Sequence, residues 1–305
     1  MIFVALFQLV VPLLLIGVLA LSRKPSIWFW FLNLVAFGMV ISFMWVSARW
    51  DASSLHFRAV LPFLFLVAAV VGFRRIRIPE KKPSRTGFVM GIVVNLALIV
   101  FMSGFNWFSF RGYLVPEGVV DLRSPLRDGR VVVLNGGASP FLNAHYRLKA
   151  QGYALDFLGL TTMGSSSNLF SDRSDLESYP IYDSRIYSPC TGVISAARDD
   201  FADQIPPHTD EQNLAGNHVL IECKGVEILL AHLKQGSVLV NIGDSVTVET
   251  ELGRVGNTGN TSEPHLHIHA ENGGEPGVFL DGRSVPITID NRFLVRGNTI
   301  SNISR

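Results

Sequence analysis

The sequence predicts a protein of two parts with different fold classes: an N-terminal all-α region of four transmembrane helices, then an all-β domain built on an antiparallel sheet. The 305 residues are unusually apolar for a wholly soluble protein, with 48% hydrophobic residues and a mean hydropathy of +0.32. Long apolar runs are confined to the first 110 residues, and short alternating runs between turn residues fill the rest. The formal charge divides at the same place, since residues 1–110 hold 10 Lys and Arg against 2 Asp and Glu (+8) and the remainder 16 against 23 (−7).

The four membrane segments are expected at about residues 2–21, 27–46, 56–73 and 87–105. A run of about 20 apolar residues is long enough to cross a bilayer. The third segment is the weakest, because its apolar core reaches that length only with part of its upstream flank. The first segment lacks a positively charged start and a small-residue cleavage site, so we expect an anchor and not a removed signal peptide.

Positive charge between these segments predicts their orientation. Residues 74–86, RRIRIPEKKPSRT, contain six Lys and Arg, and Arg23 with Lys24 lies between the first two segments. Loops of this kind stay on the cytoplasmic side of a membrane. Four crossings then leave both termini outside the cytoplasm, so that everything after Trp107 is extracytoplasmic.

The chain is expected to divide into a transmembrane region (1–107), a linker (108–130), a β domain (131–295) and a tail (296–305). Strands in the domain are indicated by RVVVLNGG, HVLIECKG, VEILLAHL and PHLHIHA, short runs bounded by Gly, Asn, Asp and Pro. Two polar stretches, 162–183 and 199–213, are predicted loops of a length that is often functional, and they are candidates for the walls of a substrate groove.

The charge distribution argues against nucleic acid as a partner. The extracytoplasmic part carries about −7 and shows no basic aromatic patch along its sequence. The basic segment at 74–85 is explained by topology and by anionic lipid headgroups, so the lipid bilayer is the partner that it indicates.

Cys190 and Cys223 both fall in strand-like stretches outside the cytoplasm. An oxidising compartment permits a disulfide between them, and two buried free thiols are the alternative. Their spacing does not decide between the two. The chain has no CxxC and no HExxH, which excludes those common zinc arrangements.

Three of the eight histidines, His265, His267 and His269, stand at alternate positions behind a loop of Gly, Asn, Thr, Ser and Pro. In a strand, side chains at i, i+2 and i+4 share one face, with successive ones roughly 6.5 Å apart. Two such imidazoles can converge on one metal, or one can bind metal while its neighbour serves a substrate. The spacing therefore predicts a metal or catalytic role, without identifying the metal.

Further stretches occur in order around these histidines. GRVGNTGNTSEPHLHIHA (253–270) contains a Gly/Thr/Ser turn, a proline and His-x-His, and AHL (231–233) precedes it, followed by GSV and GD-V. Upstream, NAHYRLKAQGYALDF (143–157) contains a histidine and an aspartate. Over about residues 130–290 the chain resembles the lysostaphin-type (LytM-like) zinc metalloendopeptidases, which cut peptide bonds in bacterial cell walls.

The resemblance implies one zinc ion per chain and a role for each matching residue. His267, the second histidine of His-x-His, and Asp156 match two metal ligands. His265 and His232 match active-site histidines that bind no metal. Most members of the family carry the remaining ligand as a histidine four residues before the aspartate, where this chain has Gly152. His145, in an N-x-H string like that of a family subgroup, is the expected replacement, which completes a set of His145, Asp156 and His267.

The other histidines have less specific interpretations. His269 stands where relatives often have Glu, so a supporting role behind the ligands is expected. His218 and His208 are expected to be structural or solvated, and His56 at a membrane flank is assigned no role. No glutamate near the histidines resembles the base of thermolysin-type enzymes, which leaves imidazole as the candidate base.

Three functions follow from the resemblance. The first is a membrane-anchored extracytoplasmic zinc endopeptidase of the bacterial inner (cytoplasmic) membrane, acting on cross-links or stem peptides of peptidoglycan on the periplasmic or cell-wall side. The second is a degenerate wall-binding or regulatory module, which the departure at Gly152 favours. The third is a peptidase acting on secreted peptides. Four helices exceed what tethering needs, so a membrane or wall-associated partner protein is a further possibility.

Overall fold

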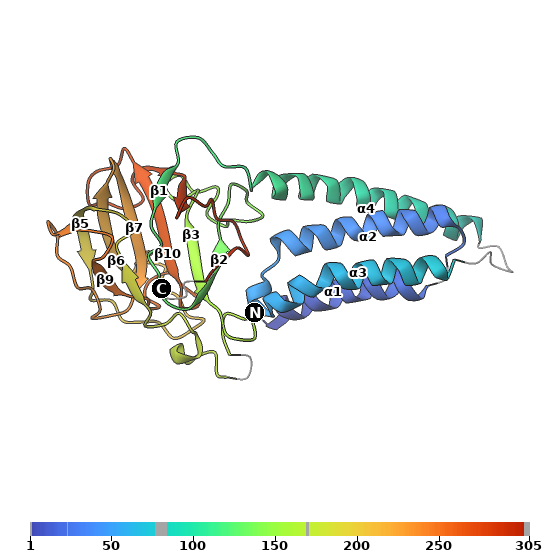
Figure 1. Cartoon of the computed structure of the whole chain (residues 1–305), viewed down its shortest axis with the longest axis horizontal. Coiled ribbons are helices and arrows are strands. Elements are labelled where there is room, and N and C mark those ends of the chain that lie inside the picture. The colour runs from blue at the N-terminus through green and yellow to red at the C-terminus, as the bar shows by residue number, and fades with distance from the viewer. Residues whose placement is uncertain (1, 23, 77–83, 169–170, 302–305) are drawn as a thin grey trace. The chain divides into compact units, whose positions relative to one another are not determined.

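A computed structural model describes residues 2–22, 24–76, 84–168 and 171–301. The chain divides into two compact units, Met1–Arg111 and Gly112–Arg305. The first unit is helical, and the second is built mainly of antiparallel strands (Figure 1). This confirms the predicted fold class.

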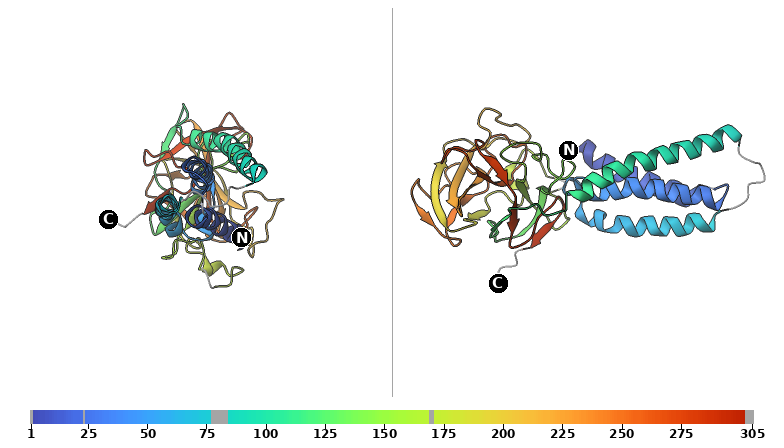
Figure 2. Two further views of the ribbon diagram at one scale, coloured as in Figure 1. Left: turned by 90° about the vertical axis from the view of Figure 1, so that its right-hand side faces the viewer. Right: turned by 90° about the horizontal axis from the view of Figure 1, so that it is seen from above.

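In its described residues the helical unit has four long helices and one short 3₁₀ turn, η1 (Trp50–Ala52). The views in Figures 1 and 2 show the helices running side by side. The helices α2, α3 and α4 are long and apolar enough to cross a membrane, and within α1 the residues Leu6–Leu21 form a shorter apolar helix. Residues 77–83 and Arg23, on which the predicted orientation depends, lie outside the described part of the chain. The four bounds are α1 (Ile2–Leu21), α2 (Ile27–Ser47), α3 (Leu55–Arg74) and α4 (Arg85–Arg111).

Polar residues in this unit cap or join the helices. The hydroxyl oxygens of Ser26 and Ser54 accept hydrogen bonds from backbone N–H groups in the first turns of α2 and α3. The buried Asn106 side chain of α4 donates to the carbonyl of Met39 in α2 at 2.9 Å. A side-chain amide between apolar helices thus contributes an interhelical bond in a setting where water is scarce.

The β unit contains one nine-stranded antiparallel sheet in the order β13-β2-β3-β10-β7-β6-β5-β8, with β11 pairing β10. The pair β4–β9 is antiparallel, whereas β1–β12 is a short parallel pair. The strand bounds are β1 (Val120–Leu122), β2 (Arg130–Asn135), β3 (Leu155–Gly159), β4 (Arg185–Tyr187), β5 (Gly192–Arg198), β6 (Asn217–Cys223), β7 (Val226–Leu233), β8 (Ser245–Val246), β9 (Glu251–Arg254), β10 (Leu266–Asn272), β11 (Arg283–Val285), β12 (Ile287–Ile289) and β13 (Thr299–Ser301).

The four runs predicted as strands correspond to β2, β6, β7 and β10. The hairpin between β6 and β7 turns at Lys224 and Gly225, whose φ angles are both positive, 55° and 79°. Two consecutive positive φ angles match the right-handed twist of the flanking strands, which explains why the turn ends in glycine. The segments expected as linker and tail also contribute strands, β1 and β13.

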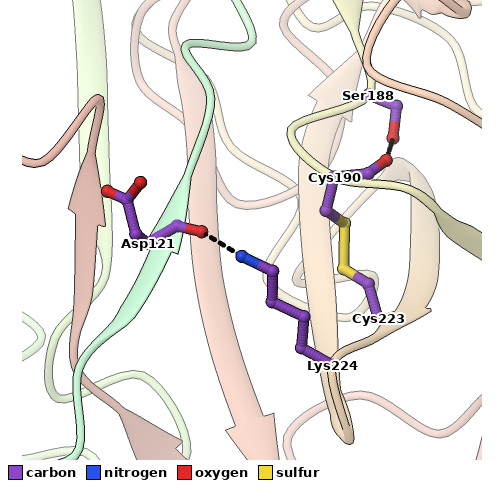
Figure 3. The surroundings of a disulfide bond; sticks show 5 residues. All are labelled: Asp121, Ser188, Cys190, Cys223 and Lys224. Carbon is purple, nitrogen blue, oxygen red and sulfur yellow. Dashed lines mark hydrogen bonds between the residues drawn. A yellow bond between two sulfur atoms is a disulfide. The ribbon is translucent and has the colours of Figure 1, made fainter.

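In the described residues the larger hydrophobic core of this unit is made of side chains from most strands of the sheet, among them Phe157 of β3 and Ile268 of β10. Cys190 and Cys223 are buried in it and form a disulfide, with Cα atoms 6.4 Å apart (Figure 3). The pairing that the sequence left open is therefore present. It ties the segment entering β5 to the end of β6.

The middle of the sheet positions the candidate site. The strands β3, β10 and β7 are neighbours, as Figure 1 shows. Their register sets Asp156 directly opposite His267, and His267 directly opposite Ala231, which precedes His232. Residues from three distant parts of the sequence thus meet at adjacent positions.

Candidate metal centre

Asp156 lies between two histidines. Its Oδ1 is 2.8 Å from Nδ1 of His267, and its Oδ2 is 2.9 Å from Nε2 of His145. One ligand atom from each of the three residues lies within 4.8 Å of the other two. The structure therefore brings together the three residues that the sequence predicted as a metal-binding set.

The side chain of Asn143 holds the loop that carries His145 to the site. The buried side chain of Asn143 accepts a hydrogen bond from the His145 backbone N–H at 3.0 Å and donates to the carbonyl of Ala154 at 3.0 Å. Gly152 lies elsewhere in this loop. A Cβ atom there would meet the carbonyl oxygens of Tyr146 and Leu148 at 3.2 and 3.3 Å. His145, from the start of the same loop, is thus the loop histidine that lies beside Asp156.

Asn135 is a site residue that the sequence reasoning missed. Its Nδ2 donates to Asp156 Oδ2 at 2.7 Å, and its Oδ1 accepts from Arg296 and from the backbone N–H of Ala144 at 3.0 and 3.1 Å. Asn135 ends β2 at an irregularity in the pairing with β3. A polar residue closing an apolar strand was the only signal in the sequence, and it is common.

The charges of the cluster follow from burial and mutual attraction. Burial alone would raise the pKa of Asp156, but the attraction and hydrogen bonds of the surrounding histidines hold that pKa well below its usual range. Burial lowers the pKa of His267 to about 3. For His145 the attraction and hydrogen bond of Asp156 outweigh burial and raise the pKa. At neutral pH the centre therefore contains a carboxylate anion and at least one neutral imidazole, the forms that bind metal.

His232 points into the site because it is a bulged residue. The register between β6 and β7 shifts at this position, and His232 has a positive φ of 66°. A bulge re-aims a side chain, and a non-glycine residue at positive φ persists only when its surroundings fix it. Here its backbone N–H donates to Ala215 O at 3.0 Å, and its ring Nδ1 lies 2.8 Å from Thr258 O. A carbonyl only accepts, so Nδ1 carries the proton and Nε2 is left with a lone pair. Burial and the neighbouring histidines hold the pKa of His232 well below its usual value.

His265 is oriented in the same manner. Its Nδ1 lies 2.9 Å from the carbonyl oxygen of Glu263, which assigns the proton to Nδ1. Its Nε2 is 3.8 Å from Asp156 Oδ1, and its ring centroid is 4.6 Å from that of His232. His232 and His265 therefore form a pair of imidazoles beside the metal-binding set but outside it.

His269 continues the line of histidines along β10. It is fully buried, with Nδ1 2.8 Å from His267 Nε2 and Nε2 3.5 Å from Glu271 Oε1. Glu271 also accepts hydrogen bonds from the backbone N–H groups of Leu280 and Gly282. Burial alone would raise the pKa of Glu271, but the hydrogen bonds from His269 and from these two backbone groups lower that pKa. The arrangement directs the His267 Nε2 proton toward His269 and leaves Nδ1 facing Asp156.

A groove of about 200 Å³ opens beside the centre. His145, His232 and His267 line it together with apolar side chains from several loops and strands. The apolar members are Leu148, Leu214, Ala215, Leu229, Ala231, Phe279 and Leu280. An apolar groove with a few convergent polar groups is the usual form of a ligand site.

The remaining histidines lie apart from the metal-binding set. The ring of His218 packs on Phe279, and its Nδ1 lies 2.7 Å from Gly216 O. His208 is exposed in the loop after β5, and His56 is in the first turn of α3. Among the described residues, the group of His145, Asp156 and His267 is the cluster with metal-binding geometry.

Two imidazole nitrogens and one carboxylate oxygen are a donor set that a catalytic zinc ion uses, with a fourth position left for water. The set meets the further requirements of an ionised carboxylate and of an outer residue that fixes a ligand tautomer. The residues of this centre therefore fit zinc.

Comparison with known proteins agrees with this geometry. The model of peptidase family M23 matches residues 178–277, which include His232, His265 and His267. His145 and Asp156 lie outside the matched residues. A search of curated proteins finds no match to the chain.

Solved structures similar to the chain include peptidases. One is a zinc-containing peptidase from Vibrio cholerae, with 19% identity, a TM-score of 0.29, and coverage of 57% of this chain but only 38% of that one. Another is the catalytic domain of lysostaphin from Staphylococcus simulans, with 17% identity, a TM-score of 0.28, and coverage of 46% and 81%. A third is the SpoIIQ–SpoIIIAH pore-forming complex, with 15% identity, a TM-score of 0.33, and coverage of 58% and 92%.

The family match falls on the same His-x-His strand and bulged histidine that the structure places beside the acidic centre. Residues 178–277 of the C-terminal unit thus match peptidase family M23, the lysostaphin-type family that the sequence resembles.

Proposed function

We propose that this protein is a membrane-anchored zinc endopeptidase that hydrolyses cross-links or stem peptides of peptidoglycan outside the cytoplasm. The observation that carries the proposal is the convergence of His145, Asp156 and His267 on one point, with His232 and His265 beside them. A site that only binds has no need of two further imidazoles with their Nε2 lone pairs unengaged by backbone.

Each group has a defined task in this proposal. The three ligands would hold a zinc ion, which when bound would supply a Lewis acid for the scissile carbonyl and lower the pKa of water toward neutrality. His232 and His265 each hold a proton on Nδ1 against a backbone carbonyl, so that Nε2 of either can take the proton of an attacking water and deliver it to the leaving amine. The bulge at His232 and the turn before His265 keep both rings from rotating away.

The membrane helices and the disulfide support an extracytoplasmic location. If the basic residues 74–86 are cytoplasmic, the chain leaves α4 on the opposite side whether or not α1 crosses the membrane. The Cys190–Cys223 disulfide is independent support, because such bonds persist in oxidising compartments. A membrane or wall-associated partner protein remains a prediction of the sequence.

The test uses the full chain in detergent, loaded with one equivalent of zinc and incubated with purified peptidoglycan. New amino termini released from the wall are the readout. We expect release by the wild type and by His218→Ala, a control whose histidine lies outside the site, and at least about a thousandfold slower release by His265→Ala. A wild type that binds zinc and peptidoglycan but releases no amino termini would contradict the proposal.

The second candidate function is a degenerate module that binds the wall. It predicts binding of peptidoglycan without release of amino termini. The departure at Gly152 is the observation that favours it. The replacement ligand His145 argues against it, because it restores the count of three. A parallel incubation with a mixture of secreted proteins tests the remaining alternative, in which the substrate is a secreted peptide.

A further inference from the structure

A second hollow lies next to the candidate metal centre and has a different chemistry. We call it the basic pocket; it has a volume of about 630 Å³. Three cations and two tyrosines line it, and no acidic residue does. Its lining consists of Tyr146, Arg147, Lys149, Tyr153 and Arg283, with Leu148, Gly152 and Ser284 between them.

The cations of the basic pocket are not neutralised by neighbouring carboxylates. The ion pairs found among the described residues include six other cations of this unit but none of Arg147, Lys149 and Arg283. Lys149 Nζ donates to the carbonyl of Asp281 at 3.0 Å, and the Asp281 carboxylate itself accepts from the backbone N–H of Glu275. The pocket is thus a local positive site on a unit with 15 Lys and Arg against 23 Asp and Glu, a net −8.

The walls of the pocket are fixed by backbone contacts. Ser284 of β11 donates its N–H to Lys149 O at 2.9 Å, and its hydroxyl oxygen accepts from the Tyr153 N–H at 3.0 Å. The rings of Tyr146 and Tyr153 meet edge to face, with centroids 6.4 Å apart. Gly152 also lines the pocket, and a Cβ at this residue would contact the carbonyl oxygens of Tyr146 and Leu148. The residue that departs from the family pattern is therefore part of this pocket.

The basic pocket and the groove at the metal centre adjoin each other at one side chain. Leu148 lines both, and the loop that carries His145 into the centre carries Tyr146, Arg147 and Lys149 into the pocket. A peptide lying in the groove with its scissile bond at the metal would therefore pass Leu148 and present its next groups to the basic pocket.

We propose that the basic pocket binds a free carboxylate of the peptide substrate, which makes the enzyme selective for acidic peptides. Guanidinium groups bind carboxylates through two parallel hydrogen bonds, and tyrosine hydroxyls can add donors. The inference rests on the proposed function, because it takes the bound peptide to be a substrate. Binding to the pocket can nevertheless be tested without catalysis. Anionic lipid headgroups carry the same sign of charge as a carboxylate. We infer a peptide and not a lipid because the pocket adjoins the groove at the metal centre.

The test is binding of two fluorescein-labelled synthetic stem peptides to the full chain in detergent, without zinc, measured by fluorescence anisotropy. One peptide has free carboxylates, and the other has each of them converted to an amide. We expect the acidic peptide to bind about tenfold or more tightly, with the preference shrinking as salt rises. Arg147→Gln with Arg283→Gln should abolish the preference, whereas Arg292→Gln, a matched exposed arginine outside the pocket, should leave it intact.

Equal binding of the two peptides by the wild type would overturn the proposal, and that comparison does not depend on how any variant folds. A preference that survives the double substitution would overturn it as well. If the variant loses binding to vesicles containing phosphatidylglycerol but keeps the peptide preference, the pocket belongs to lipid and the proposal is wrong. Carboxylate-dependent binding without peptidoglycan cleavage by the zinc-loaded chain would uphold the pocket and contradict the proposed function.

Discussion

His267 and Asp156 face each other across β10 and β3, with Nδ1 and Oδ1 2.8 Å apart. Two residues earlier, just before β10 begins, His265 keeps its Nε2 3.8 Å from the same oxygen and engages its Nδ1 with Glu263 O. These two histidines, two residues apart, thus have different relations to the acidic centre. The difference lies in which ring nitrogen faces the carboxylate of Asp156, Nδ1 in His267 and Nε2 in His265.

Single substitutions should separate these two roles. We expect His267→Ala to lose zinc, because only two ligands remain, and His265→Ala to retain about one zinc per chain while losing peptidase activity. Zinc per chain, measured by mass spectrometry of the detergent-solubilised protein, and release of amino termini are the readouts. Zinc retained by His267→Ala and lost by His265→Ala would reverse the assignment.

The position of the first ligand gives a second prediction. His145→Ala should remove zinc, and adding Gly152→His should not restore it. A Cβ at residue 152 would meet the carbonyl oxygens of Tyr146 and Leu148 and the Cβ of Ser284, none of which belongs to the metal-binding set. Zinc content of the single and double variants is the measurement. Recovery of zinc in the double variant would show that the usual family position can still reach the metal.

Much of this site could be predicted from the sequence, because its residues lie in strands and motifs. The alternation of His265, His267 and His269 fixes their shared face, and the apolar run before Asp156 indicates a strand. Register could not be predicted, since the pairing of β3 with β10 joins segments more than a hundred residues apart. The bulge that aims His232 inward lies in another pairing, that of β6 with β7, whose register could not be predicted either.

Contacts between loops were beyond the reach of sequence patterns. Asn135 is a polar residue at the end of an apolar strand, which is a common pattern. Its contact with Asp156 depends on an irregularity in the register of β2 with β3. The basic pocket was missed for a similar reason, because Arg283 joins Arg147 and Lys149 only through the position of β11 beside β10. Cations that are scattered along a sequence give no local signal of a patch.

The line from His267 through His269 to Glu271 gives a third prediction. His269→Ala should leave all three ligands in place but weaken zinc binding about 10- to 100-fold, because the Nε2 proton of His267 loses the acceptor that orients the ring. Competition with a fluorescent zinc chelator measures the dissociation constant. The control is His218→Ala, whose ring contacts Phe279 and not the centre. Unchanged zinc affinity in His269→Ala would mean that strand pairing alone orients His267.

The fourth prediction concerns the disulfide between Cys190 and Cys223, which closes a loop across a sequence separation of 33. Restricting the unfolded chain over a loop of that length stabilises a protein by about 3–4 kcal/mol. Replacing both cysteines by serine should lower the free energy of unfolding of the β unit by that amount, measured by pulse proteolysis of the full chain in detergent at increasing urea.

The disulfide belongs to the core, and neither cysteine is a member of the metal-binding set, so zinc content should be unchanged in folded protein. Under a reducing agent the wild type should fall to the stability of the serine variant, because the cross-link is then absent from both. If the two differ by less than about 1 kcal/mol in oxidising buffer, the bond contributes little to stability. The loop from β5 to β6 would then be restrained in the unfolded chain by other contacts.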